Sequence, residues 1–469
     1  MNQSATPILE SATPSPATAG ARARAERILH GPILPTILKL TAPNLVVMLA
    51  QALANFLESY YVGLLGVAAL AGAALVFPLL MLMLMMSGGG IGGGISSAVA
   101  RALGAGDHDK ADALALHALV ITGALGLLCS AVVLLAGPLI YRAMGGEGEA
   151  LAAALTYSNA IFSGVVFLWL MNGMSSVLRG SGNMILPAGV LTGGVLVLLV
   201  LSPTLIFGIG PVPAFGIAGA GAALACYYLL ATVVLLTNLL RGRGGVRLSL
   251  AHPLRKALFR EILGVGLWSS LNTVLSNLCV IVATFFVART SMEALAGFGL
   301  GLRIEYLQIP IVFGIGTGLV AMVGMNIGAG QYQRARRIAW TGVAVAALAT
   351  ETVGLAAALF PQAWLHLFTH DPDAIATGTT YLRTVAPTYA LLGVGLALYF
   401  ASQGAGRMAW PLASGIARLV VLTLGGWLMS YWLPGNITAL CGALVAGLVV
   451  YALINSLPWL SRRWLADLS

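Results

Sequence analysis

The chain is a succession of apolar stretches that are long enough to cross a lipid bilayer. A transmembrane helix needs about 20 mostly apolar residues, and helices satisfy their own backbone hydrogen bonds within lipid. Only 8% of the residues are charged, whereas 59% are hydrophobic. The sequence therefore predicts an all-α integral membrane protein with twelve spans. We place them at residues 34–62, 68–100, 112–136, 151–178, 184–208, 215–240, 259–287, 293–328, 335–360, 373–403, 408–432 and 437–460.

Positive charge is distributed unevenly between the two sides of these spans. Most of the 24 Lys and Arg residues lie in the tails and in the even-numbered connections, whereas Arg142 and Arg289 lie in the others. Because positive residues are retained in the cytoplasm, both termini are predicted to be cytoplasmic. Topology thus accounts for the net charge of +9, and we expect no nucleic-acid partner. The predicted partner at this stage is the lipid bilayer, and we expect a monomer.

The sequence repeats itself after 224 residues. The segment at 179–187 recurs at 403–411, pairing Gly180 with Gly404 and Pro187 with Pro411. At the same offset Tyr157 pairs with Tyr381, and Tyr227 with Tyr451. Residues 69–72 match 294–297 at an offset of 225, which one inserted residue explains. Each repeat holds six spans, so the halves are predicted to be parallel repeats about an axis along the membrane normal, as in transporters.

This duplication divides the chain into two six-helix lobes. The predicted organisation is a disordered cytoplasmic tail at 1–32, an N-terminal lobe at 33–240, a basic linker at 241–258, a C-terminal lobe at 259–460 and a cytoplasmic tail at 461–469. Transporters place their substrate site between or within such halves and rock the halves against each other.

Glu58 lies inside the first predicted span. Polar residues spaced three or four apart share one face of a helix with it. Such a face must look into protein or water, so we interpret it as a wall of an aqueous cavity. The alternative is a stripe buried against neighbouring helices, with Glu58 neutral or paired. The polar residues of this face are Asn44, Gln51, Asn55 and Glu58.

Glu58 is a candidate ion-coupling residue because the spans of its own half contain no cation apart from Lys39, which we count with the cytoplasmic side at the start of the first span. An intramembrane carboxyl group with neutral neighbours can exchange a proton at physiological pH. A sodium ion would instead need several oxygen ligands, which Glu58 and Asn55 could share with the fourth-span residues Tyr157, Asn159 or Asn172. Spacing leaves the choice between proton and sodium open.

The second half carries its own intramembrane charges. Glu305, Arg383 and Arg418 each lie about 15 Å from a span end. Unpaired charges at that depth are costly, so we expect Glu305 to pair with an Arg. The second half also has a polar face at Ser269, Thr273 and Ser276. The residues predicted to line a substrate cavity between the lobes are Asn44, Gln51, Asn159, Ser269, Thr273, Ser276, Glu305, Arg383 and Arg418.

No pattern in the sequence indicates an enzyme, a bound cofactor or a resident metal. The four cysteines lie scattered in apolar segments, so we predict neither a disulfide nor a metal site beyond transient sodium at Glu58. The glycine-rich segment at 88–94 lacks the Lys and Ser/Thr of a phosphate-binding loop. It is more typical of close helix packing.

The chain resembles the multidrug and toxic compound extrusion family, and within it the DinF-like bacterial branch, over residues 33–460. The resemblance is carried by Glu58 five residues before Gly63, the glycine-rich second span followed by residues 101–107, the segment 326–330, and the turns at 179–182 and 403–406. It implies two six-helix lobes and export of organic cations in exchange for protons or sodium. The first-span acid of this family is usually Asp, and Glu58 keeps the charge.

Some members of that family also carry acids in the seventh and tenth spans. The matching seventh-span position here is Ser276, and the tenth span has Arg383 but no acid. The resemblance therefore implies coupling through the first lobe. We expect a proton- or sodium-coupled antiporter of amphipathic, mostly cationic compounds. The alternative is a flippase or exporter of lipid-linked or anionic substrates, which the Arg residues of the second half would favour.

Overall fold

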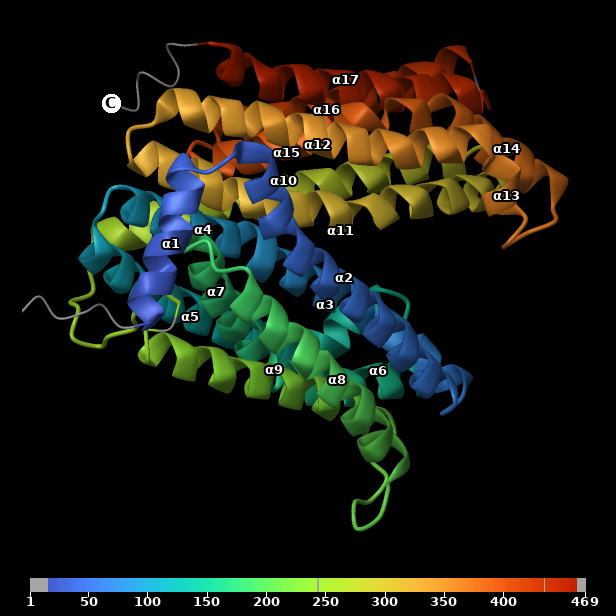
Figure 1. Ribbon diagram of the computed structural model, residues 1–469. Coiled ribbons are helices and arrows are strands. Elements are labelled where there is room, and N and C mark those ends of the chain that lie inside the picture. The colour runs from blue at the N-terminus through green and yellow to red at the C-terminus, as the bar shows by residue number, and fades with distance from the viewer. Residues whose placement is uncertain (1–15, 243, 434, 462–469) are drawn as a thin grey trace, which may run out of the picture.

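The computed structural model describes residues 16–242, 244–433 and 435–461. Within these ranges the regular elements are all helices (Figure 1). The first half contains α1 (Pro16–His30), α2 (Ile33–Gly63), α3 (Val67–Met85), η1 (Met86–Ile91), α4 (Gly92–Gly104), α5 (His108–Ala143), α6 (Gly148–Phe162), α7 (Val165–Gly180), α8 (Ile185–Phe207) and α9 (Ile217–Leu240). The second half contains α10 (Lys256–Ala288), α11 (Met292–Gly328), α12 (Tyr332–Leu359), α13 (Pro361–Leu365), α14 (Pro372–Thr384), η2 (Ala386–Thr388), α15 (Tyr389–Gly404), α16 (Ala409–Trp432) and α17 (Ile437–Leu460).

These helices give the twelve predicted spans. Eleven segments of the described chain are long and apolar enough to cross a membrane on their own. The twelfth span is the pair α6 and α7, which is bent by 46°. The predicted all-α membrane fold with two six-helix lobes is confirmed.

Both repeated turn motifs end a helix in the same way in each half. Gly106 and its counterpart Gly330 have φ of 76° and 70°, and Gly182 and Gly406 both have φ of 75°. Glycine adopts this left-handed conformation without the steric cost that other residues carry. The repeated glycines therefore form equivalent turns in the two halves.

The expectation of a disordered tail over residues 1–32 is wrong for its second part. Residues 16–30 form α1, which packs against α11. Ile28 is buried, and its carbonyl oxygen accepts a hydrogen bond of 3.3 Å from Asn326 Nδ2. The low-complexity composition concealed one apolar side chain that anchors the helix. Residues 1–15 and 462–469 lie outside the described part of the chain.

The first half has one residue more than the second half, and the structure shows where this residue lies. The second span contains the π-helical turn η1, whereas the matching part of the second half lies in the continuous α-helix α11. A π-turn closes its hydrogen bonds over five residues rather than four and so accommodates an extra residue within a helix. The offset of 225 therefore applies before η1 and the offset of 224 after it.

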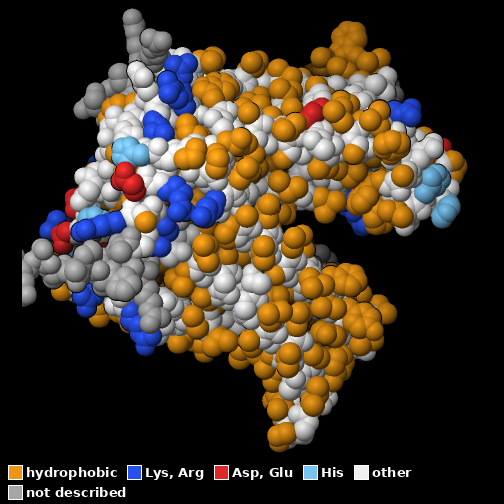
Figure 2. Space-filling view, in the orientation of Figure 1, with side chains coloured by type: hydrophobic (Ala, Val, Ile, Leu, Met, Phe, Trp, Pro, Cys, Tyr) orange, Lys and Arg blue, Asp and Glu red, His pale blue; other side chains and the backbone are white. Residues whose placement is uncertain are grey.

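The two lobes meet at one end of the molecule. There α4 crosses α11, with Gly104 against the backbone of Met325 and Gly328 against the backbone of Arg101. Glu261 at the start of α10 joins the lobes as well: its carboxylate oxygens lie 3.2 Å from Arg101 Nη2 and 2.9 Å from Lys110 Nζ. Figure 2 shows Lys and Arg gathered at this end and a hollow between the lobes at the opposite end.

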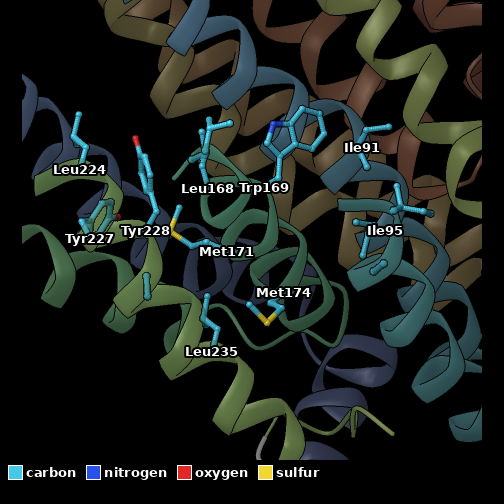
Figure 3. Close-up of a cluster of buried hydrophobic side chains, with 14 of the residues drawn as sticks. Ile91, Ile95, Leu168, Trp169, Met171, Met174, Leu224, Tyr227, Tyr228 and Leu235 are labelled. Carbon is cyan, nitrogen blue, oxygen red and sulfur yellow. The ribbon is translucent and has the colours of Figure 1, made fainter. Parts of the chain in front are cut away.

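The core of the N-terminal lobe forms around α7. Figure 3 shows Trp169, Met171 and Met174 of α7 between isoleucines of η1 and α4 on one side and side chains of α9 on the other. Trp169 is 1% exposed. This packing fixes α9, whose tyrosines border the site described below.

Candidate functional site

Glu58 lies in a cavity inside the N-terminal lobe. The cavity has a volume of about 370 Å³ and is bounded by α2, α3, α6, α8 and α9. Small side chains on α2 and α3, namely Ala54, Ala73 and Ala74, leave the space open. The remaining lining residues are Gln51, Asn55, Glu58, Ser59, Val62, Leu70, Phe77, Leu80, Met81, Leu84, Tyr157, Val195, Leu198, Leu224, Tyr227 and Tyr228.

We expected the polar face of α2 to form a wall of an aqueous cavity, and Asn44 and Gln51 to line a substrate cavity between the lobes. The structure places the cavity that contains Glu58 and Gln51 within the N-terminal lobe instead. Helical spacing predicted the polar face of α2 but could not identify which helices pack against it. Gln51, Asn55 and Glu58 face the cavity, whereas Asn44 lies one or more turns away at the lobe interface. There Asn44 Nδ2 donates a hydrogen bond of 2.7 Å to Thr317 Oγ1 of α11.

A tyrosine hydroxyl group binds the carboxylate of Glu58. Tyr157 Oη of α6 donates a hydrogen bond to Glu58 Oε1 at 3.2 Å. Tyr227 and Tyr228 of α9 are the other titratable residues that line the cavity, and its lining contains no Lys or Arg. An ionised carboxylate can accept about four hydrogen bonds. Glu58 thus keeps acceptor capacity for a proton, a metal cation or a cationic substrate.

Two of the predicted fourth-span residues lie elsewhere. Asn172 is buried on α7 and donates a hydrogen bond of 2.8 Å from Nδ2 to Ser87 Oγ in the π-turn η1. Asn159 is on the exposed side of α6 and does not line the cavity. The expectation that either residue could join Glu58 is corrected. Asn172 is separated from Glu58 by the bend between α6 and α7, and Asn159, two residues after Tyr157, points to a different face of α6.

The predicted polar face of the seventh span is divided between two environments. Ser269 Oγ is buried and accepts a hydrogen bond of 2.8 Å from Gln403 Nε2. Thr273 and Ser276 donate their hydroxyl groups to carbonyl oxygens of their own helix, α10. None of the three lines the Glu58 cavity.

Gln403 is an interface residue that the sequence reasoning missed. Besides Ser269, it donates from Nε2 to the carbonyl oxygen of Gly89 at 3.1 Å, and its side chain occupies space that a Cβ at Gly93 would fill. It thus joins α15 to the glycine-rich second span. The signal that could have identified it was its place in the repeat, where the first half has Arg179.

Glu305 has the arginine partner that we expected. Arg418 Nη2 of α16 lies 3.9 Å from Glu305 Oε1, and Tyr381 Oη donates a hydrogen bond of 3.2 Å to Glu305 Oε2. Arg383, in contrast, is exposed on α14. Of the charged residues predicted to line the cavity, the structure brings together Glu305 and Arg418, but it does not place them with Glu58.

Most of the chain matches known membrane transporters in sequence. The profile of the MatE family matches residues 43–204 and 269–428, which is more than half of the chain. The chain therefore belongs to the MatE family, and its 11 to 12 candidate spans agree with a multi-pass membrane transporter.

Similar proteins agree with this assignment. An FAD transporter of Shewanella oneidensis is 26% identical over 85% of this chain and 88% of its own length. The multidrug export protein MepA of Staphylococcus aureus is 24% identical over 91% of this chain and 95% of its own. A solved structure, the outward-facing conformation of a multidrug resistance MATE family transporter, superimposes with a TM-score of 0.84 and 25% identity, covering 95% of this chain and 98% of that one.

Proposed function

We propose that this chain is a cation-coupled antiporter that exports amphipathic, mostly cationic organic compounds across a bacterial inner membrane, with both termini in the cytoplasm. The observation that carries the proposal is Glu58, a carboxylate in a largely apolar cavity whose polar neighbours are neutral. Coupling by a proton or by sodium fits this site, with Asn55 and Tyr157 as further oxygen ligands for sodium.

The cavity suits an amphipathic cation. Its volume falls within the range of about 300–1,000 Å³ typical of small-molecule sites. Leu, Phe and Met side chains line one part of it, and three tyrosines line another. Aromatic faces attract organic cations, and Glu58 offers the compensating negative charge.

One carboxylate shared by ion and substrate supports exchange. A substrate cation near Glu58 would lower the affinity for a proton or sodium there, and linkage requires the reverse effect of the same size. If the two ligands favour opposite conformations, the ion gradient drives export. The lobes touch at the basic end and open at the other, so in the proposed orientation this conformation faces outward.

The test is efflux of ethidium from vesicles that contain the purified chain, with a proton or a sodium gradient imposed separately. We expect one gradient to drive efflux and Glu58→Gln to abolish the gradient dependence. Glu351→Gln is the matched control, because this intramembrane acid of the other lobe accepts a backbone hydrogen bond from Ala390 that Gln also accepts. Full gradient-driven efflux by Glu58→Gln would refute the mechanism.

A second candidate function is export of an anionic or lipid-linked compound. Two observations favour it: Arg303 and Arg383 are exposed in the C-terminal lobe, and one relative is named as an FAD transporter. Arginine binds phosphate and carboxylate groups through paired hydrogen bonds. The same vesicles loaded with FAD would test it, with uptake or efflux expected to fall in Arg303→Ala and Arg383→Ala.

A further inference from the structure

The two lobes share a tyrosine–carboxylate contact that the sequence repeat does not predict. Tyr157 and Tyr381 are counterparts 224 residues apart, and each donates a hydrogen bond of 3.2 Å to a glutamate. The glutamates themselves are not counterparts. Glu58 of α2 matches Ala283 of α10, and no acid stands there in the second half.

Glu305 reaches the same kind of site from the neighbouring helix. It precedes the point that matches η1, so the offset of 225 applies and its counterpart is Leu80 of α3. Leu80 lines the Glu58 cavity. The C-terminal lobe thus places a carboxylate beside its tyrosine in the region that corresponds to the ion-binding cavity of the N-terminal lobe.

The two sites differ because only the C-terminal one contains a positively charged side chain. The counterpart of Arg418 is Gly194, which packs against the ring of Tyr227 and leaves the N-terminal site without a charged side chain. Arg418 instead places its guanidinium 5.5 Å from the ring centre of Tyr451, the counterpart of Tyr227, and 3.9 Å from Glu305.

Among the described residues, Arg418 forms the ion pair with Glu305. Tyr306 on its own helix, Tyr389 and Cys279 interact with Glu305 electrostatically, in addition to Tyr381 and Arg418. Only Arg418 among these carries a positive charge. The side chains of the pair are 18% and 14% exposed, so the carboxylate would be left largely buried and unpaired without Arg418, which is costly.

We propose that Arg418 is the resident cation of a second carboxylate–tyrosine site, formed by Glu305 and Tyr381, and that it limits coupling to one ion per transport cycle. Removal of the guanidinium turns Glu305 into a second binding site for a proton or a monovalent metal cation. This inference rests on the proposed function, because it takes ion binding at Glu58 as the first coupling event.

The experiment measures how many ions exchange for one substrate. Vesicles with the membrane potential clamped at zero receive a tenfold gradient of the ion that drives the wild type, and the ethidium gradient at zero net flux is determined. Each coupled ion multiplies this balancing gradient by about ten. We expect about tenfold for the wild type and about a hundredfold for Arg418→Leu.

Two matched variants identify the source of the additional ion. Arg418→Lys retains a cation beside Glu305, so its balancing ethidium gradient is expected to stay at about tenfold. The double variant Arg418→Leu with Glu305→Gln removes both charges. Its balancing ethidium gradient is expected to return to about tenfold. A folded, transport-active Arg418→Leu that still balances at tenfold would overturn the proposal.

A further variant covers the case in which Arg418→Leu does not fold. Glu305→Gln alone is expected to leave the balancing gradient at the wild-type value, because the native Glu305 holds Arg418 and no coupling ion. Loss of coupling in Glu305→Gln would overturn the inference while leaving the role of Glu58 intact. A wild type that shows no coupling at all would instead overturn the proposed function and, with it, this inference.

Discussion

The crossing of α4 and α11 predicts a specific effect of alanine at Gly328. A Cβ at this position would lie 2.8 Å from the carbonyl carbon of Arg101 and 3.0 Å from the backbone nitrogen of Ala105, where ordinary contacts are 3.4–4 Å. Gly104, its counterpart in the first half, meets the backbone of Met325 in the same way. Backbone atoms cannot rotate out of the way, so the helices must separate.

The magnitude follows from the cost of overpacking. Inserting a methyl group into a well-packed interface typically costs about 1–3 kcal/mol. In the proposed alternating-access cycle this crossing exists only while the basic end is closed, so the full cost falls on one conformation. Since about 1.4 kcal/mol is a factor of ten, Gly328→Ala should shift the equilibrium about 5- to 150-fold toward the conformation open at the basic end.

Spin labels on the two lobes can measure this shift. Asp109 of α5 and Gln333 of α12 are exposed at the basic end, and cysteines there would carry the labels in a background without the native cysteines. Double electron–electron resonance should show a longer distance gaining population in Gly328→Ala. Gly299→Ala on the same helix is the control, because a Cβ at Gly299 meets nothing within 4 Å.

Combining the two alanines sharpens the test. One separation of the helices relieves both overlaps, so Gly104→Ala added to Gly328→Ala should shift the populations less than the sum of the single effects. A distance distribution in Gly328→Ala that matches both the wild type and Gly299→Ala would refute the argument that this crossing holds the basic end closed.

Three further predictions use single contacts. Tyr157→Phe should weaken gradient-driven efflux by about tenfold, because it removes a hydrogen bond of about 1–1.5 kcal/mol from Glu58. Tyr381→Phe should leave the efflux rate unchanged. Equal effects of the two variants in an efflux assay would contradict the assignment of coupling to the first lobe. His117→Ala should lower the free energy of unfolding by about 1–3 kcal/mol in a detergent melt, because Nε2 of this buried ring accepts the Arg255 backbone N–H at 2.9 Å; an unchanged melting temperature would be the contrary result. Glu261→Gln should raise cysteine labelling at the basic end by removing the ion pairs with Arg101 and Lys110, and labelling equal to the wild type would argue against a role in closure.

The spans and the duplication were predictable from the sequence because both depend on local patterns. Hydrophobic length sets a transmembrane helix, and the repeated glycines fix equivalent turns in each half. The pairing of Glu305 with an Arg followed from the cost of an isolated charge. The helix α1 was not predictable in this way, because its stability depends on the contact of Ile28 with a distant helix.

The surroundings of Glu58 were only half predictable. Helical spacing correctly grouped Gln51, Asn55 and Glu58. It could not show that α8 and α9 of the same lobe close the cavity, because the packing partners of a helix depend on tertiary structure. Asn172 was misplaced for the same reason: a 46° bend between α6 and α7 separates it from Tyr157.

The π-turn η1 is one difference between the two lobes, and the charged residues are another. The extra residue in the first half changes the register between α3 and α4, and the turn presents Ser87 to Asn172. The second half lacks this residue, and α11 continues as a regular helix from Glu305 to the lobe crossing at Gly328. Before the turn, α3 offers Leu80 to the cavity where α11 offers Glu305. Duplication therefore explains the common tyrosines and the common fold, whereas the carboxylates and Arg418 stand at positions that the two halves do not share. The repeat alone would assign the same charged site to both lobes. The positions of Glu58, Glu305 and Arg418 therefore have to be read from the sequence and structure of each lobe separately.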